Sequence, residues 1–186
     1  AIAVLRRNPY RLAGDIAGIG FKTADRMARQ MALPADAPMR VEAGVLYLLG
    51  ELADQGHVFA PRTDLVGRAT EMLAVSDALV NEAIDRLDRQ KQIAIEPPVA
   101  DNGTPDAGPA LYLPYLHQAE CGVAGMLGQL SNVPAAVTPM EGDEALSLAQ
   151  KHAPVNLVPG QLAAVRSAVS AKVMVITGGP GTGKTT

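Results

Sequence analysis

The chain has 186 residues, of which 48% are hydrophobic but only 3% aromatic, with no Trp and a formal net charge of −3. Such a core must be made from Ala, Leu, Val and Ile, which favours packed helices over a β-sandwich. One cysteine, Cys121, excludes a disulfide framework and a multi-cysteine zinc site, and no apolar run reaches the roughly 18 residues of a membrane span. We expect Cys121 to be a small core residue on a helix, in a soluble, cytoplasmic protein that contacts no membrane.

Charge is distributed unevenly along the chain. Residues 1–40 carry seven Lys and Arg against three Asp, a local balance of +4, so the remaining residues carry −7, the difference between −3 and +4. The basic residues are Arg6, Arg7, Arg11, Lys22, Arg26, Arg29 and Arg40. Residues 1–40, here called the basic front, are therefore positively charged, and the rest of the chain is negatively charged. This distribution indicates a polyanionic partner for the basic front only.

The first elements form a helical hairpin. Asn8-Pro9 is a good helix start, because Asn can cap a helix and Pro suits its first position. A tight turn at Gly18-Ile19-Gly20 follows, and a second helix is predicted over about 21–32, ending before Pro34.

The next region, residues 40–116, has the element order of a winged helix. Hydrophobic periodicity and turn residues give the boundaries, with Ser76 as a helix cap. The predicted elements are a helix over 40–54, a strand at 57–59, helices over 63–73 and 77–89, a strand at 93–95, a wing loop over 96–109 and a strand at 111–113.

Residues 117–158 then form a predicted helical connector, with a Gly-rich helix and a shorter helix near 143–152. A helix from Gln161 to about Ser170 follows. It leads into the apolar run 173–177, which is typical of a buried parallel strand. A phosphate loop begins directly after this run.

The phosphate loop matches the pattern G-x-x-x-x-G-K-[ST]. Glycines let the backbone turn its N–H groups toward phosphate oxygens. Lys184 would reach the β- and γ-phosphates and Thr185 would ligate Mg²⁺, which makes these two the predicted catalytic residues and ATP with Mg²⁺ the predicted cofactors. The loop residues predicted to bind the nucleotide are Gly178, Gly179, Pro180, Gly181, Thr182, Gly183, Lys184, Thr185 and Thr186. Because a parallel strand needs neighbours, we expect these 186 residues alone neither to bind ATP tightly nor to hydrolyse it.

The hairpin has the same kind of phosphate-binding groups as the phosphate loop, here suited to DNA. Backbone N–H groups at a glycine turn and a helix N-terminus suit a DNA phosphate, and nearby cations add sequence-independent, salt-sensitive attraction. An ordinary glycine-capped helical turn is the alternative. The residues predicted to bind DNA are Gly18, Ile19, Gly20, Lys22, Thr23 and Arg26, with Arg29 as a further counter-charge.

These motifs together resemble the N-terminal region of RecD-like (RecD/TraA-type) superfamily 1 DNA helicases. The resemblance rests on Asn8-Pro9-Tyr10-Arg11-Leu12, on the segment from Gly18 to Asp25, on Arg40, Ala43-Gly44 and Gly56-His57, and on residues 178–186. It implies a mainly α chain in four parts. These are a helix-hairpin-helix region at 1–39, a winged-helix-like α/β region at 40–116, a helical connector at 117–158 and the truncated start of a RecA-like P-loop α/β domain at 159–186.

The resemblance also implies a function for the parent protein. Such helicases couple ATP hydrolysis to 5′-to-3′ movement on single-stranded or forked DNA, in DNA repair or recombination. They carry a glutamine that reads the adenine edge just where Gln161 stands, although by itself Gln161 is a polar residue at a helix start.

Two further regions carry weaker predictions. The helix over 77–89 bears Asp77, Glu82, Asp85 and Asp88 against Arg86 and Arg89, so the winged-helix-like region is expected to be structural or to bind a protein rather than DNA. The six aromatic residues are few and scattered in sequence, which argues against a base-stacking platform.

Two alternatives to a helicase remain, namely a non-catalytic DNA-binding or protein-docking module and an AAA+-type DNA remodelling ATPase.

Overall fold

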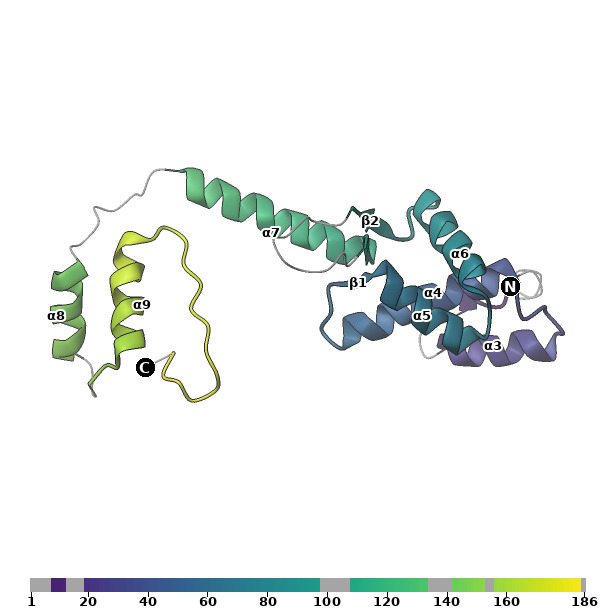
Figure 1. Cartoon of the computed structure of the whole chain (residues 1–186), viewed down its shortest axis with the longest axis horizontal. Helices are drawn as coiled ribbons and strands as arrows, with labels where there is room; N and C mark the ends of the chain where they lie inside the picture. The colour runs from purple at the N-terminus through teal and green to yellow at the C-terminus, as the bar shows by residue number, and fades with distance from the viewer. Residues whose placement is uncertain (1–7, 13–18, 98–107, 134–141, 153–155, 185–186) are drawn as a thin grey trace. The chain divides into compact units, whose positions relative to one another are not determined.

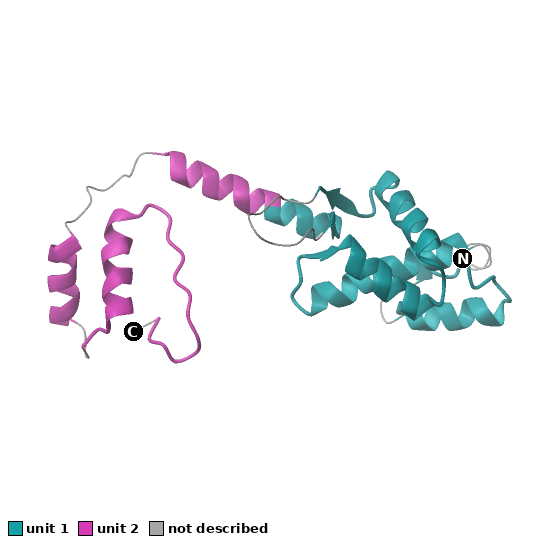
Figure 2. Cartoon of the chain, in the orientation of Figure 1, with its two compact units in different colours: residues 1–120 teal, residues 121–186 magenta. Residues whose placement is uncertain are grey.

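The computed structural model describes residues 8–12, 19–97, 108–133, 142–152 and 156–184 (Figure 1). The chain divides into two compact units, unit 1 at residues 1–120 and unit 2 at residues 121–186 (Figure 2). Helices dominate both units, as the composition predicts. Within the described residues, no helix has the length and apolar character needed to cross a membrane.

Unit 1 contains the predicted winged helix. A three-stranded antiparallel sheet has the order β1-β3-β2, with Leu111 of the central strand opposite Ala60 and Ile95. Most of the predicted wing loop lies outside the described residues. The elements of unit 1 are α3 Phe21–Gln30, α4 Pro38–Asp54, β1 Phe59–Pro61, α5 Arg62–Leu73, α6 Asp77–Arg89, β2 Ala94–Glu96 and β3 Ala110–Tyr112, and α7 Pro114–Asn132 begins in it.

Local sequence signals set the ends of these helices. Pro38 occupies the first turn of α4, and the Ser76 hydroxyl accepts the Leu79 N–H at 3.5 Å at the start of α6. Helix α5 ends on Ala74, whose φ of 53° is left-handed. Gly44 allows α4 to approach α5 closely, because a Cβ there would lie 2.8 Å from the methyl groups of Leu73.

The core of unit 1 lies between its helices and the inner face of its sheet. Its largest fully buried side chains include Val41, Val45, Leu65, Val80, Ile84, Leu87, Ile93 and Leu111. These come from α4, α5, α6 and β3 and from the end of the α6–β2 connection, so each of these segments has an apolar face that another one covers.

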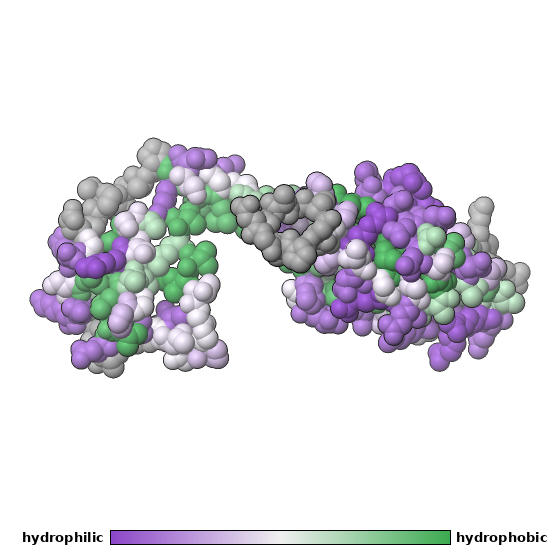
Figure 3. All heavy atoms as spheres, viewed as in Figure 1, coloured by the Kyte–Doolittle hydropathy of each residue, from purple (hydrophilic) through white to green (hydrophobic). Residues whose placement is uncertain are grey.

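Unit 2 is less completely packed. Helix α8 (Gly142–His152) lies against α9 (Pro159–Ser170), and an ion pair joins Arg166 to Asp143. Ala145 is the one described residue of this unit that is buried. Figure 3 shows hydrophobic side chains at the surface of this unit, whereas the visible face of unit 1 is mainly hydrophilic.

Two sequence predictions for unit 2 are wrong. Residues 173–177 form no strand, and Val175 and Ile176 are 81% and 53% exposed, because the described residues provide no neighbouring strand. Cys121 is exposed on α7 rather than buried, and no residue of that helix is buried.

Candidate nucleotide and nucleic-acid sites

The phosphate loop follows the exposed 173–177 segment and curls around its own lysine. Gly181 and Gly183 have φ values of 75° and 73°, which favour glycine. The Thr182 hydroxyl donates to the carbonyl oxygen of Gly179 at 2.8 Å. Lys184 Nζ donates to the carbonyl oxygens of Gly178 and Gly179, each at 2.6 Å. The ammonium group thus lies inside the loop, in contact with backbone acceptors that the phosphate oxygens of a nucleotide would replace.

Gln161 and the phosphate loop line one pocket of about 460 Å³. The Gln161 side chain accepts the Val158 N–H at 3.0 Å and donates to the carbonyl oxygen of Thr182 at 3.4 Å. It therefore links the start of α9 to the loop. The rest of the pocket wall is largely apolar, with Leu157, Ala164, Val165, Ala168 and Ile176.

An apolar wall next to a phosphate loop fits a nucleoside triphosphate. Lys184 would hold its phosphates, and Gln161 lines the same pocket. The two residues predicted to complete the site, Thr185 as the Mg²⁺ ligand and Thr186, lie outside the described residues.

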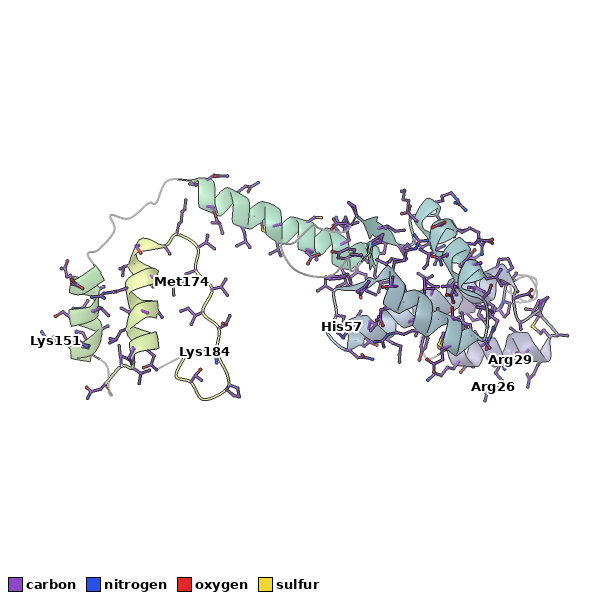
Figure 4. All side chains as sticks on the ribbon, viewed as in Figure 1. Arg26, Arg29, His57, Lys151, Met174 and Lys184 are labelled. Carbon is purple, nitrogen blue, oxygen red and sulfur yellow. The ribbon has the colours of Figure 1, made fainter. Side chains whose placement is uncertain are left out.

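The hairpin site is described from Ile19 onward, and Gly18 lies outside this part. Gly20 is exposed and immediately precedes α3, and no side chain caps the N–H groups at the start of that helix. Lys22, Arg26 and Arg29 are exposed on α3 at helical spacing, whereas Ile19 and Thr23 are half-buried. Figure 4 labels Arg26 and Arg29 on this helix.

Not every basic residue of the front is available to DNA. Arg40 is 3% exposed, and its guanidinium donates to Asp25 at 2.7 Å through Nε and to the carbonyl oxygens of Ala35 and Leu73 at 2.6 and 2.9 Å. The Tyr10 hydroxyl also donates to Asp25, at 2.8 Å. Burial removes Arg40 and Asp25 as a neutral pair. Among the described residues up to 40, the exposed charges are then Arg11, Lys22, Arg26 and Arg29 against Asp36, a balance of +3.

The charge state of Asp25 follows from these partners. Burial acts to raise its pKa, but hydrogen bonds from Arg40 and Tyr10 and the positive charges of Arg40 and Arg29 hold the pKa below its ordinary value. Arg29 contributes two contacts to Asp25, each at 3.1 Å, while its side chain remains 68% exposed. The network fixes α3 to α4 and to the end of α5, and so holds α3 on the winged helix.

Sequence reasoning missed a row of aromatic rings beside this site. Tyr10 stacks on Phe21 with ring centroids 5.9 Å apart, and Phe21 stacks on Tyr47 at 5.3 Å. These three residues are scattered in sequence but lie together in the fold, and the expectation that the aromatic residues form no base-stacking platform stays a prediction. Their separations in sequence, 11 and 26 residues, follow no helical or strand period. The packing of α3 on α4 joins Phe21 to Tyr47, and the segment before α3 adds Tyr10.

Comparison with known proteins agrees with this arrangement. Residues 1–59 match the family described as the ATP-dependent RecD2 DNA helicase HHH (helix-hairpin-helix) domain, and residues 161–186 match a family described as an AAA domain. The ATP-dependent RecD2 DNA helicase of Deinococcus radiodurans is 27% identical over 175 residues, which are 92% of this chain and 24% of that relative. The chain thus spans about a quarter of the length of the curated relative it matches.

The matched helix-hairpin-helix domain, the winged helix and the phosphate loop, in this chain order, fit the N-terminal part of a P-loop helicase. Within that class, the chain is similar to the N-terminal region of RecD-like helicases over nearly its whole length. The resemblance seen in the sequence motifs is therefore confirmed.

Proposed function

We propose that this chain is the N-terminal part of an ATP-dependent helicase that moves 5′-to-3′ on single-stranded DNA and works in DNA repair or recombination. Within the 186 residues, unit 1 supplies DNA binding and unit 2 supplies the start of the nucleotide site. The observation that carries the proposal is the set of exposed basic residues on α3, Lys22, Arg26 and Arg29. They stand on a closed core and within the residues that match a helix-hairpin-helix domain.

The binding chemistry follows from this helix. Free N–H groups after Gly20 and the positive end of the helix dipole favour a backbone phosphate, and Lys22 and Arg26 lie one turn apart beside them. These groups contact the sugar–phosphate backbone and no base edge, so they hold single-stranded or forked DNA without sequence preference.

ATP is the proposed nucleotide of the parent protein. Its triphosphate would replace the loop carbonyls at Lys184, Thr185 would hold Mg²⁺, and Gln161 would meet the adenine edge. The proposal is supported by the shared pocket of Gln161 and the loop.

The winged helix is proposed to contact a protein partner rather than DNA. Asp77, Glu82 and Asp85 are exposed on α6, the helix that most often enters a DNA groove in this fold. Their carboxylates give this helix an acidic surface that phosphates would avoid, even though Arg62 pairs with Asp85 at 2.8 Å.

Fluorescence anisotropy with labelled single-stranded and forked DNA tests the proposal. We expect the double variant Lys22→Glu and Arg26→Glu to bind on the order of tenfold more weakly, with the slope of log affinity against log salt reduced by about 1.4, or 0.7 for each lost phosphate contact. The matched control, Arg68→Glu with Lys151→Glu, removes the same charge from exposed positions outside α3. Equal losses in both variants would show that the hairpin is not the DNA contact.

A further inference from the structure

A groove of about 780 Å³ opens in unit 1 beside the proposed phosphate contact. Gly20, which precedes α3, lies on its wall, and the opposite parts of the wall come from α4 and from the segment after α6. The groove therefore begins where a DNA backbone held by α3 would pass. The proposed phosphate contacts of the hairpin do not involve the inside of this groove.

The aromatic row ends inside this groove. Tyr10 and Phe21 are 5% and 6% exposed, and the interplanar angles along the row are 23° and 22°, so the rings are held nearly parallel. Tyr47 is half-buried and lines the groove. Packing thus fixes one end of the row in the core and leaves its last ring accessible, which is the property of a stacking platform.

The charges around Tyr47 suit an anionic chain. Lys22 Nζ lies 5.8 Å from the centre of the Tyr47 ring, on an exposed and flexible side chain that can reach a phosphate next to that ring. Glu42, an acid on the groove wall, is paired with Arg86 at 2.6 Å, so its charge is compensated.

Uncharged hydrogen-bonding groups complete the wall. The amides of Gln90 and Gln92, joined by a 2.9 Å hydrogen bond, and that of Asn8 lie around the groove. A side-chain amide offers both a donor and an acceptor, as the edge of every nucleobase does. Met39, Ala43 and Leu46 provide apolar surface, and Arg11 also lines the groove.

We propose that this groove binds one unpaired base of the DNA strand whose phosphates the N-terminus of α3 holds, with the base stacked at Tyr47 and its phosphate beside Lys22. The inference rests on the proposed DNA binding and adds base contact to it. It makes unit 1 selective for single-stranded or locally opened DNA over a closed duplex, because a paired base is not free to enter.

The test compares two oligonucleotides of equal length and charge with the 186-residue chain. One is an ordinary single strand, and the other carries abasic tetrahydrofuran residues at its central positions. We expect the abasic strand to bind at least about fivefold more weakly. In the Tyr47→Leu variant, affinity for the ordinary strand falls by the same factor and the difference between the strands disappears. Tyr47→Phe keeps the ring and behaves like the unmodified chain.

The outcomes separate this inference from the proposed function. Equal affinity of the unmodified chain for both strands overturns the base-binding groove while leaving DNA binding in place. Absence of salt-sensitive binding to either strand overturns the proposed function itself. If Tyr47→Leu fails to fold, the comparison of the two strands on the unmodified chain and on Tyr47→Phe still decides the matter. A strand difference that persists in a folded Tyr47→Leu variant places the base elsewhere and overturns the inference.

Discussion

Units 1 and 2 both contain amphipathic helices and apolar runs, but only unit 1 buries them. The helices of unit 1 enclose side chains such as Leu65, Ile84 and Leu87 that have no exposed surface, whereas in unit 2 Val175 is 81% exposed. This difference shows that an apolar sequence predicts that a face will be buried, but does not predict which element will cover it. A hairpin and a winged helix close their own core, while a parallel strand needs neighbouring strands and covering helices.

The same difference separates the two phosphate-binding features. Both rely on backbone N–H groups near glycines, yet α3 stands on a closed core and the phosphate loop follows a segment whose apolar side chains are largely exposed. Precise placement of donors is what gives such a site its affinity. We therefore expect the hairpin to bind its ligand in this chain and the phosphate loop to bind ATP weakly.

The largest expected effect is on the buried network that holds α3 in unit 1. The substitution Arg40→Met leaves the Asp25 carboxylate in place and removes the guanidinium that joins it to the carbonyl oxygens of Ala35 and Leu73. Breaking one side of a buried ion pair costs about 3–5 kcal/mol, so the free energy of unfolding, measured by urea denaturation, should fall by that amount.

Acid provides the control for this substitution. Because the pKa of Asp25 is lowered in the folded chain, its stabilising contribution is present above its ordinary pKa of about 3.9 and is lost as pH falls through the lowered folded value. The unmodified chain should lose this contribution in acid, and the double variant Asp25→Asn with Arg40→Met should recover much of the stability that Arg40→Met loses. A loss below about 1 kcal/mol for Arg40→Met would contradict the network's role.

Two substitutions with smaller expected effects on the free energy of unfolding compare the packing of the two units directly. Ile84→Ala, in the core of unit 1, should lower the free energy of unfolding by roughly 2–4 kcal/mol, because it opens a cavity between α6 and its neighbours. Val175→Ala should change it by no more than about 0.5 kcal/mol, because that side chain lies in solvent. Circular dichroism during urea denaturation gives both values. A cost of about 2 kcal/mol for Val175→Ala would indicate the buried strand that the sequence predicts.

The elements of unit 1 could be predicted from sequence because their signals are local. Ser76 caps α6 as expected, Pro38 starts α4 within two residues of the predicted boundary, and the three short strands fall within two residues of their predicted positions. Periodic apolar residues and turn residues within about ten positions of one another were sufficient for this.

The features that escaped prediction depend on contacts between distant segments. Nothing near Arg40 in the sequence distinguishes a buried partner of Asp25 from a surface cation that binds DNA. The stack of Tyr10, Phe21 and Tyr47 likewise exists only once α3 has packed on α4. The strand at 173–177 was predicted from its apolar composition alone. Composition does not show whether neighbouring strands are present to form a sheet with it.

The central proposal is that unit 1 of this chain binds DNA, whereas the nucleotide site of unit 2 is too incompletely packed to bind ATP tightly. Parallel calorimetric titrations with single-stranded DNA and with Mg²⁺–ATP test it most directly. We expect saturable, salt-sensitive binding of DNA and no saturable binding of Mg²⁺–ATP in the micromolar range. Micromolar binding of Mg²⁺–ATP that Lys184→Ala abolishes, or the absence of DNA binding, would contradict the claim.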